Sequence, residues 1–256
     1  MLKGKRGIIF GVANDHSIAW GISKKLSEHG AELALTYQND TLLKRIEPLS
    51  KKINSKLLIE CDFSQSNSIK KCFDDLNQKW DNIDFVVHAA AFSNKNELNG
   101  RYIDTSLSNF INTLNISCYS FTEISKLASS MMKNGGSLLT LSFYGANKVM
   151  PNYNVMGVAK AALEMSVKYL SVDLGKNNIR VNAISAGPMR TISGAAIANA
   201  REVYKYTEKN SPLHRNVRLD ELGNTALYFV SDLSKAISGE IHYVDCGFNV
   251  IGMPQN

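Results

Sequence analysis

The chain has 256 residues, of which 44% are hydrophobic and 20% are charged, so it can bury a sizeable core, and we expect a single domain over residues 1–256. The net charge of +6 comes from scattered basic residues, as in Lys51-Lys52 and Lys70-Lys71, which is typical of solvated helix faces and argues against a nucleic-acid-binding protein. A basic surface also suits an acidic protein partner.

The four cysteines form no CxxC pair and have no histidine at zinc-site spacing, so the sequence indicates neither a metal site nor a disulfide framework. Free cysteines are typical of a reducing cytoplasm, which is the compartment we expect. We find no cleavable apolar leader and no apolar run of bilayer-spanning length, so we expect an unprocessed protein without a membrane span.

Seven short apolar runs alternate with helical segments along the chain. They are residues 7–10, 32–36, 57–60, 85–89, 137–141, 181–184 and 241–244. Runs that are apolar on both faces are typical of buried parallel strands, whose right-handed crossovers place helices on both faces of the sheet. The sequence therefore predicts a doubly wound, parallel seven-stranded α/β fold, with the ligand beyond the carboxyl ends of the strands.

Three features after the first strand favour a dinucleotide site. Gly11 permits a tight turn, Ser17 can donate to a phosphate, and the backbone amides near Ile18 open a helix whose positive end favours a pyrophosphate. The segment lacks the G-x-G-x-x-G pattern, so a plain strand–turn–helix with a serine cap is the alternative interpretation.

The ends of the next strands supply candidates for the adenosine half. Gln38 stands where an acidic residue usually binds the adenosine ribose of NADH, or where a basic residue binds the 2′-phosphate of NADPH. Its neutral amide supplies no counter-charge for a 2′-phosphate, which favours NADH over NADPH. The basic residues Lys44 and Arg45, which follow soon after, weaken this preference. Asp62 and Phe63 follow the third strand and can bracket an adenine. Small residues around Ala90 follow the fourth strand and allow a close approach of the cofactor. Simple packing is an equal alternative for both segments.

Tyr153 and Lys160 are seven residues apart in a predicted helix, so both side chains lie on one helix face, about 10 Å apart along the axis. The lysine can bind the sugar hydroxyls of a cofactor and favour negative charge near the phenol. The phenol can donate to an oxygen that gains charge during a reaction. The same spacing also occurs at the polar edge of an amphipathic helix.

Residues 190–209 follow the sixth strand and begin with small residues. This composition is consistent with a substrate-binding loop and helix that close over the site as a lid, and equally with an ordinary surface helix.

With these motifs the chain resembles the FabI-type bacterial enoyl-[acyl-carrier-protein] reductases, a divergent branch of the short-chain dehydrogenase/reductase superfamily with a Rossmann-type fold. The resemblance covers nearly the whole chain. It rests on Gly11-Val12-Ala13 with Ser17-Ile18-Ala19, Thr36-Tyr37-Gln38, Cys61-Asp62, residues 151–160, residues 183–191 and Ile237-Ser238-Gly239-Glu240.

The resemblance implies NADH-dependent reduction of the trans-2 double bond of enoyl thioesters carried by acyl carrier protein, and it implies a homotetramer. Tyr153 would bind the thioester oxygen, Lys160 the nicotinamide ribose, Gln38 the adenosine ribose, and Asp62 and Phe63 the adenine. The remaining implied contacts are with the nicotinamide end for Ala90, Met189, Arg190, Thr191, Ile192 and Ser193, and with the acyl chain for Phe92, Ser93, Phe143, Tyr144, Met156 and Ile197.

Two departures from the family pattern concern Phe143, where a second tyrosine is usual, and Cys246, where the family has glycine. Phe143 keeps an aromatic wall but donates no hydrogen bond, so either Tyr153 suffices, or Tyr144 turns inward, or turnover is reduced. We favour the first. Two other functions remain open: a ketone reductase, which would need tyrosine at the position of Met156, and a cofactor-binding homologue with reduced or altered activity.

Overall fold

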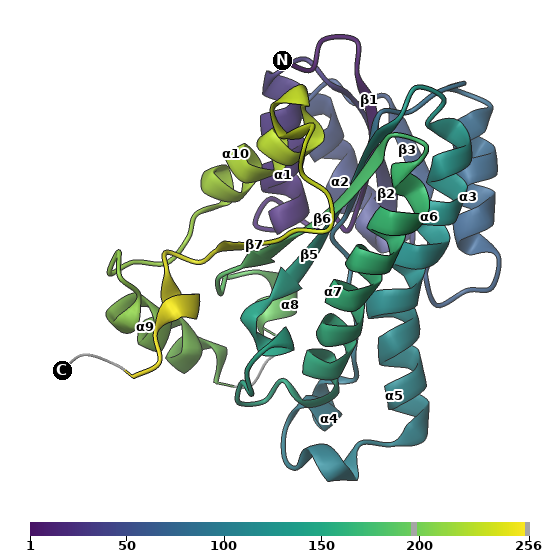
Figure 1. The fold of residues 1–256 in the computed structure, drawn as a ribbon. Coiled ribbons are helices and arrows are strands. Elements are labelled where there is room, and N and C mark those ends of the chain that lie inside the picture. The colour runs from purple at the N-terminus through teal and green to yellow at the C-terminus, as the bar shows by residue number, and fades with distance from the viewer. Residues whose placement is uncertain (196–198, 254–256) are drawn as a thin grey trace.

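Seven strands run parallel in one sheet in the computed structural model (Figure 1). The structure describes residues 1–195 and 199–253. The spatial order is β3-β2-β1-β4-β5-β6-β7. The strands are β1 (Arg6–Phe10), β2 (Glu32–Tyr37), β3 (Leu57–Glu60), β4 (Phe85–His88), β5 (Gly136–Phe143), β6 (Ile179–Ala186) and β7 (Ile241–Val244). The predicted fold class is confirmed, and each predicted run lies on one strand, except that Ala89 of the fourth run follows the end of β4.

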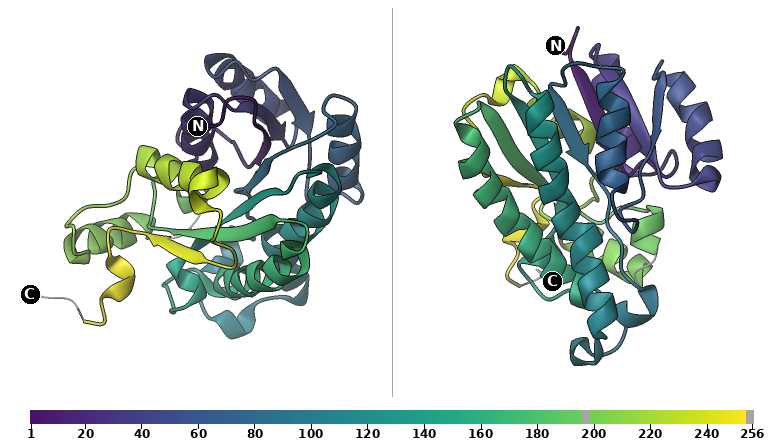
Figure 2. Two further views of the ribbon diagram at one scale, coloured as in Figure 1. Left: turned by 45° about the horizontal axis from the view of Figure 1, so that its top comes forward. Right: turned by 90° about the vertical axis from the view of Figure 1, so that its right-hand side faces the viewer.

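Helices cover both faces of this sheet, as the views in Figures 1 and 2 show. They are α1 (Ile18–Glu28), α2 (Asp40–Lys52), α3 (Ser68–Asn77), α4 (Lys95–Leu98), α5 (Leu107–Leu114), α6 (Ser120–Met131), α7 (Asn154–Gly175), α8 (Ile192–Ala195), α9 (Ala200–Asn210) and α10 (Leu219–Val230). Within the described residues, none of these helices is both long and apolar enough to cross a bilayer.

Alternate residues of each strand feed two separate cores. On β1, Ile9 packs in the core that α1, α2 and α10 cover, whereas Ile8 packs in the core under α3, α6 and α7. Successive side chains of a strand point to opposite faces, and a parallel sheet covered on both faces therefore needs apolar residues at both parities. For this reason the strands correspond to uninterrupted runs of apolar residues in the sequence.

The chain winds outward in two directions from the boundary between β1 and β4. From β1 it proceeds to β2 and β3 on one side, and from β4 to β5, β6 and β7 on the other. In open α/β sheets the crevice beyond the carboxyl ends of the strands at such a switch point is the usual ligand site. The Ile8–Val86 register pair marks this boundary.

Strands β5 and β6 extend beyond their predicted ends. Their pairing runs from Gly136 with Ile179 to Phe143 with Ala186, so β5 continues two residues past Leu141. The extra residues of β5 are Ser142 and Phe143, which are polar and aromatic and break the aliphatic pattern from which the strand was predicted. The extension carries both residues to the carboxyl edge of the sheet.

A candidate active site at the switch point

A cavity of about 1380 Å³ opens at the carboxyl ends of β1, β4, β5 and β6. Its walls come from the β1–α1 turn, the segment after β4, the end of β5, the start of α7, residues 186–194 and the first half of α9. Candidate residues that were distant in sequence meet here. They are Gly11, Ser17, Ile18, Ala90, Phe92, Ser93, Phe143, Tyr153, Met156, Lys160, Met189, Arg190, Thr191 and Ile192.

The β1–α1 turn forms a close-fitting cradle at one end of the cavity. Gly11 has φ +94°, and a Cβ there would overlap the carbonyl of Ala89 at the end of β4, so only glycine fits. Ser17 precedes the first turn of α1, which contains no acidic residue, and its hydroxyl donates to the carbonyl of Asn14 at 2.7 Å. An anionic group fits against this helix end.

Gln38, Asp62 and Phe63 lie together beyond β2 and β3, outside the residues that line the cavity. The amide nitrogen of Gln38 donates to Asp62 Oδ1 at 3.1 Å, and Ser64 donates to the same oxygen from its backbone and its hydroxyl. The Phe63 ring is stacked on His88, with centroids 5.7 Å apart and planes 6° apart. Their predicted adenosine contacts stay predictions.

Tyr153 caps the start of α7, and its side chain is only 7% exposed. The Phe143 ring meets it edge to face at 5.1 Å between centroids, and a Cβ on Gly145 would come within 2.5 Å of the Tyr153 ring. Close packing on two sides thus fixes the direction of the phenol. Burial raises the pKa of Tyr153, so its hydroxyl remains a proton donor at neutral pH.

Lys160 lies two turns further along α7, on the face that the helix buries. Its Nζ donates to the carbonyl oxygen of Leu141 at 2.7 Å, and the side chain is 6% exposed. Burial lowers the pKa of Lys160 to about 8, because the charged form loses its hydration. Tyr153 and Lys160 therefore face one cavity, and the spacing marks more than the polar edge of an amphipathic helix.

Beneath the cavity, a π-helical turn, η2 (Asn115–Tyr119), joins α5 to α6. It aims Ser117 at the backbone of Phe92, where the Ser117 hydroxyl accepts from the amide at 3.0 Å and donates to the carbonyl at 3.0 Å. Ser120 and Thr140 hold the two ring nitrogens of His88, each at 2.9 Å. Burial and the Lys160 cation lower the pKa of His88 to about 3, so His88 is neutral.

The described residues after β6 line one side of the cavity; the predicted lid over residues 190–209 stays a prediction, and its residues 196–198 lie outside the described residues. Thr191 accepts the Gly194 amide at 2.9 Å, and the Arg190 guanidinium lies 4.6 Å from the centroid of the Tyr204 ring on α9. Ser193 belongs to α8, and Ile197 lies outside the described residues. Arg201, Val203 and Tyr204 of α9 also line the cavity; the sequence singled out Arg201, with Lys205 and Lys209, as a candidate contact for an acidic protein partner, but not Val203 or Tyr204.

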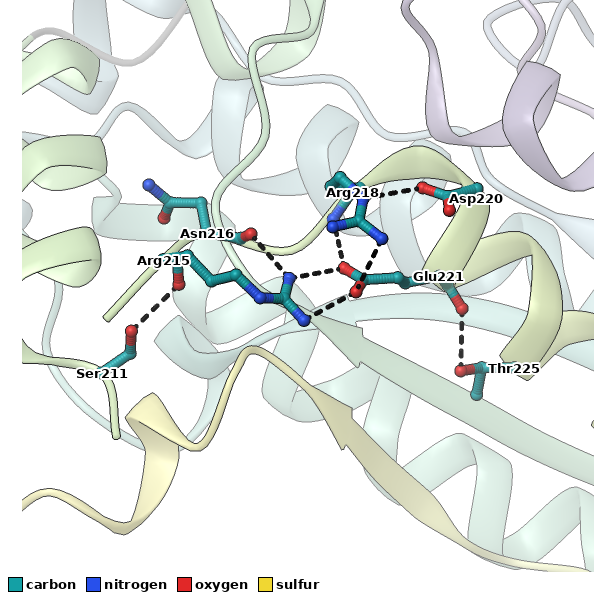
Figure 3. Close-up of polar contacts among 7 residues, drawn as sticks. All are labelled: Ser211, Arg215, Asn216, Arg218, Asp220, Glu221 and Thr225. Atoms are coloured by element: carbon teal, nitrogen blue, oxygen red, sulfur yellow. Dashed lines mark hydrogen bonds and ion pairs between the residues drawn. The ribbon is translucent and has the colours of Figure 1, made fainter. Parts of the chain in front are cut away.

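The connection between α9 and α10 is anchored to α10, as Figure 3 shows. Arg215 forms two parallel hydrogen bonds to Glu221, of 2.9 and 2.7 Å, and the Arg218 amide donates to the same carboxylate at 2.8 Å. The Ser211 hydroxyl, just after α9, donates to the Arg215 carbonyl at 3.0 Å. Bidentate arginine–carboxylate pairs hold a defined geometry, so the connection after α9 is held in a defined position against α10.

Tyr144 does not line the cavity, which argues against the predicted acyl contact and against the idea that it turns inward. Its ring packs edge to face against Phe248, at 5.7 Å, and against Tyr243, at 6.5 Å. Consecutive residues at a strand end point to opposite sides, so when Phe143 faces Tyr153, Tyr144 faces away. The Tyr144 hydroxyl does not replace the hydroxyl that Phe143 lacks.

Several lining residues were not predicted. Asn109 on α5 accepts the Asn94 amide at 3.0 Å and shapes the wall after β4. Leu98 and Met150 pack in one cluster with Tyr153, and Asn112 and Pro151 also line the cavity. These residues lie on a short helix, a loop and a helix face that show no chemical motif. Their place in the wall follows only from the three-dimensional packing of α4 and α5 against α7.

The comparison with protein families decides the assignment. The protein-family model described as enoyl-(acyl carrier protein) reductase matches residues 11–249 of the chain. The chain belongs to this reductase family. The predicted resemblance is therefore confirmed over nearly the whole chain.

Individual members of the enoyl reductase family are similar at full length. The chain is 55% identical to enoyl-[acyl-carrier-protein] reductase [NADH] 2 of Rhizobium meliloti over 99% of this chain and 95% of that protein. The crystal structure of FabI from Candidatus Liberibacter asiaticus has a TM-score of 0.97 at 52% identity and covers 99% of this chain and 98% of its own. The Anaplasma phagocytophilum reductase in complex with NAD has a TM-score of 0.94 at 54% identity and covers 99% and 95%.

Proposed function

We propose that the chain catalyses NADH-dependent reduction of the trans-2 double bond of enoyl-acyl-carrier-protein thioesters, the last step of each fatty-acid elongation cycle. The observation that carries this proposal is the convergence of Tyr153 and Lys160 on one cavity that also contains the Gly11 cradle. Relatives whose names state this NADH-dependent activity match 98–99% of the chain, which confirms the predicted activity and cofactor.

The residues of the cavity fit a dinucleotide. The Gly11 turn and the start of α1 accept the pyrophosphate, small residues at Ala89 and Ala90 leave room beside β4, and Lys160 reaches the nicotinamide ribose. Gln38, with its amide held by Asp62, meets the adenosine ribose without supplying a counter-charge for a 2′-phosphate. This arrangement favours NADH over NADPH.

Tyr153 acts as the hydrogen-bond donor to the thioester oxygen. NADH, when bound, supplies a hydride to Cβ of the enoyl group. Negative charge then appears on the thioester oxygen at the other end of the conjugated system, where the neutral phenol stabilises it. The nearby Lys160 cation favours the same negative charge, and solvent supplies the proton to Cα.

The position of the phenol separates this reaction from ketone reduction. A ketone reductase of the superfamily has its tyrosine one turn before the lysine, and Met156 occupies that position, with its side chain on the cavity wall. Tyr153 is one turn further out, which suits an oxygen that is displaced from the carbon accepting the hydride. The same displacement disfavours a ketone substrate.

Acyl carrier protein, an acidic protein, is the partner, and α9 is the surface that we assign to it. Arg201, Lys205 and Lys209 are exposed at spacings of four residues, so they share one side of α9, flanked by Glu202 and Glu208. Arg201 also lines the cavity mouth, where a thioester would enter. Residues 190–209 then form the lid within one Rossmann-type domain, with Arg190 against Tyr204 as its inner contact.

A homotetramer is the expected assembly, and an exposed apolar face supports self-association. Large apolar side chains follow helical spacing along α7 and the neighbouring α5–η2 rod, which lie side by side in Figures 1 and 2. They are Leu107, Ile111, Tyr119, Val158, Met165, Tyr169 and Val172. Contiguous exposed apolar surface of this kind marks an interface. We place the assembly in the cytoplasm, where thiols stay reduced.

The experiment that tests the activity follows NADH oxidation with crotonyl-CoA, with NADPH in parallel, and identifies the product by mass. Conversion to butyryl-CoA with NADH is the expected result. Acetoacetyl-CoA serves as the ketone substrate, and its reduction to the hydroxyacyl thioester would favour the ketone reductase instead. NADH binding without conversion of either thioester would favour the homologue with reduced or altered activity.

A further inference from the structure

Glu164 is a second charged residue on the buried face of α7, one turn after Lys160. Its side chain is 9% exposed. Both carboxylate oxygens are engaged: Ser142 donates to Oε1 at 2.5 Å, and the Asn147 amide donates to Oε2 at 3.0 Å. A buried carboxylate is costly unless it is paired or hydrogen-bonded, and such cost is usually tolerated where the charge has a role.

The hydrogen bonds of Glu164 join α7 to the segment that positions both reacting side chains. Ser142 stands between Leu141, whose carbonyl accepts the Lys160 ammonium, and Phe143, whose ring packs on Tyr153. By binding Ser142, the Glu164 carboxylate therefore also fixes two neighbouring groups relative to α7. These are the Leu141 carbonyl, which accepts from Lys160, and the Phe143 ring, which packs on Tyr153. This is a geometric link between the end of β5 and the site.

The charge of Glu164 also acts on Lys160. Residues four apart on a helix are neighbours, and a negative charge beside an ammonium favours the protonated form. Burial lowers the pKa of Lys160, and Cys118 on η2 and then Glu164 oppose that shift; because burial raises the pKa of Cys118 and keeps it a neutral thiol at neutral pH, Glu164 supplies the full negative charge. Glu164 also raises the pKa of Tyr153, which keeps the phenol protonated.

Other titratable groups that face this pair do not supply a competing anion at neutral pH. They are His88 on β4, which is neutral, Cys118, whose pKa burial raises, and Tyr243 on β7, whose pKa burial raises and whose hydroxyl contacts Asn147. Glu164 is thus the carboxylate that acts on Lys160.

We propose that Glu164 is a positioning residue for this reaction: its buried carboxylate ties the end of β5 to α7 and keeps Lys160 in the charged ammonium form. The inference rests on the proposed role of Lys160. Glu164 touches neither substrate nor cofactor and acts through Ser142 and Lys160.

The test measures the protonation of Lys160 directly, without cofactor or substrate. The full-length protein is labelled with acetic anhydride over a pH series, and mass spectrometry gives the extent of modification at Lys160, which follows the neutral amine. In Glu164→Gln the labelling midpoint should fall by about one pH unit, because the ammonium loses its anionic neighbour. The alkaline limb of the pH dependence of kcat/KM should move in the same direction.

Two variants separate charge from packing. Asn147→Ala removes a hydrogen bond to the same carboxylate but keeps its charge, so its labelling midpoint should stay at or above the native one. Asp173→Asn removes an exposed carboxylate from the same helix and should leave the midpoint unchanged. A midpoint for folded Glu164→Gln within about 0.2 pH units of the native value would overturn the proposal.

An equal acid shift in Asn147→Ala would also overturn the proposal, because packing alone would then explain the effect. If Glu164→Gln does not fold, Asn147→Ala decides on its own, since a lowered midpoint in a variant that keeps the carboxylate contradicts control by charge. The labelling is independent of NADH, so the role of Lys160 in binding NADH is judged separately by the affinity of Lys160→Ala for NADH.

Discussion

The ring of Phe143 packs edge to face on Tyr153, with centroids 5.1 Å apart and planes at 66°. The contact gives Tyr153 a rigid neighbour but no second hydroxyl, and Tyr144 faces the opposite side toward Phe248. Of Phe143, Tyr144 and Tyr153, Tyr153 is therefore the residue whose phenol lines the cavity. The packing of Phe143, and not a hydrogen bond from it, is what positions Tyr153.

Phe143→Tyr should change kcat for crotonyl-CoA by less than about threefold, because the added hydroxyl is not required once the ring wall is present. Phe143→Leu, which removes the wall, should lower kcat by roughly tenfold. Steady-state kinetics with both variants measures the two effects. A Phe143→Tyr enzyme more than about tenfold faster than the native chain would mean that the missing hydroxyl limits turnover.

Gln38→Arg should shift cofactor preference toward NADPH. A guanidinium beside the adenosine ribose can pair with the 2′-phosphate, whereas the native amide offers it no charge. The ratio of kcat/KM with NADH to that with NADPH should fall by at least about tenfold. Gln78→Arg adds the same charge at an exposed position after α3 and should leave the ratio unchanged. An equal change in both variants would refute a local role for Gln38.

Tyr204→Leu removes the ring that the Arg190 guanidinium covers at 4.6 Å. A cation–π contact contributes about 0.5–2 kcal/mol, so we expect KM for the thioester to rise about two- to thirtyfold with little change in kcat. Tyr206→Leu is the matched control, because Tyr206 is on the same helix but contacts Phe248. If both variants behave alike, the contact with Arg190 does not control the lid.

Tyr169→Glu places a charge on the exposed apolar face of α7, where Tyr169 is 70% exposed in the single chain. Burying that charge in a subunit interface is unfavourable, so light scattering after size-exclusion chromatography should give a lower mass than for the native assembly. Leu233→Glu, at a position that is 59% exposed away from this face, should keep the native mass. A native mass for Tyr169→Glu would exclude this face from the interface.

The sequence predicted the seven strands well because a parallel sheet buried on both faces needs long apolar runs. The end of β5 was missed because Ser142 and Phe143 are not aliphatic, although their pairing with β6 continues. The seven-residue spacing of Tyr153 and Lys160 predicted that both side chains lie on one helix face, because seven residues make nearly two turns of an α-helix. Such local periodicity was sufficient for both features.

Other parts of the site depend on tertiary packing. The direction of Tyr144 follows from the exit angle of β5, and the place of Asn109 in the wall follows from the way α5 meets the loop after β4. Glu164 carried one readable signal, a charge four residues after Lys160 on the buried face of α7, but only the structure shows its partners Ser142 and Asn147.

The most direct test of the central claim, that Tyr153 stabilises the thioester oxygen during conjugate reduction, compares Tyr153→Phe with the native chain. We expect kcat for crotonyl-CoA with NADH to fall by at least about 100-fold while the affinity for NADH, measured by fluorescence titration, changes less than about twofold. The Phe side chain keeps the packing against Phe143 and Gly145 and removes only the donor. Undiminished kcat in folded Tyr153→Phe would contradict the assigned role.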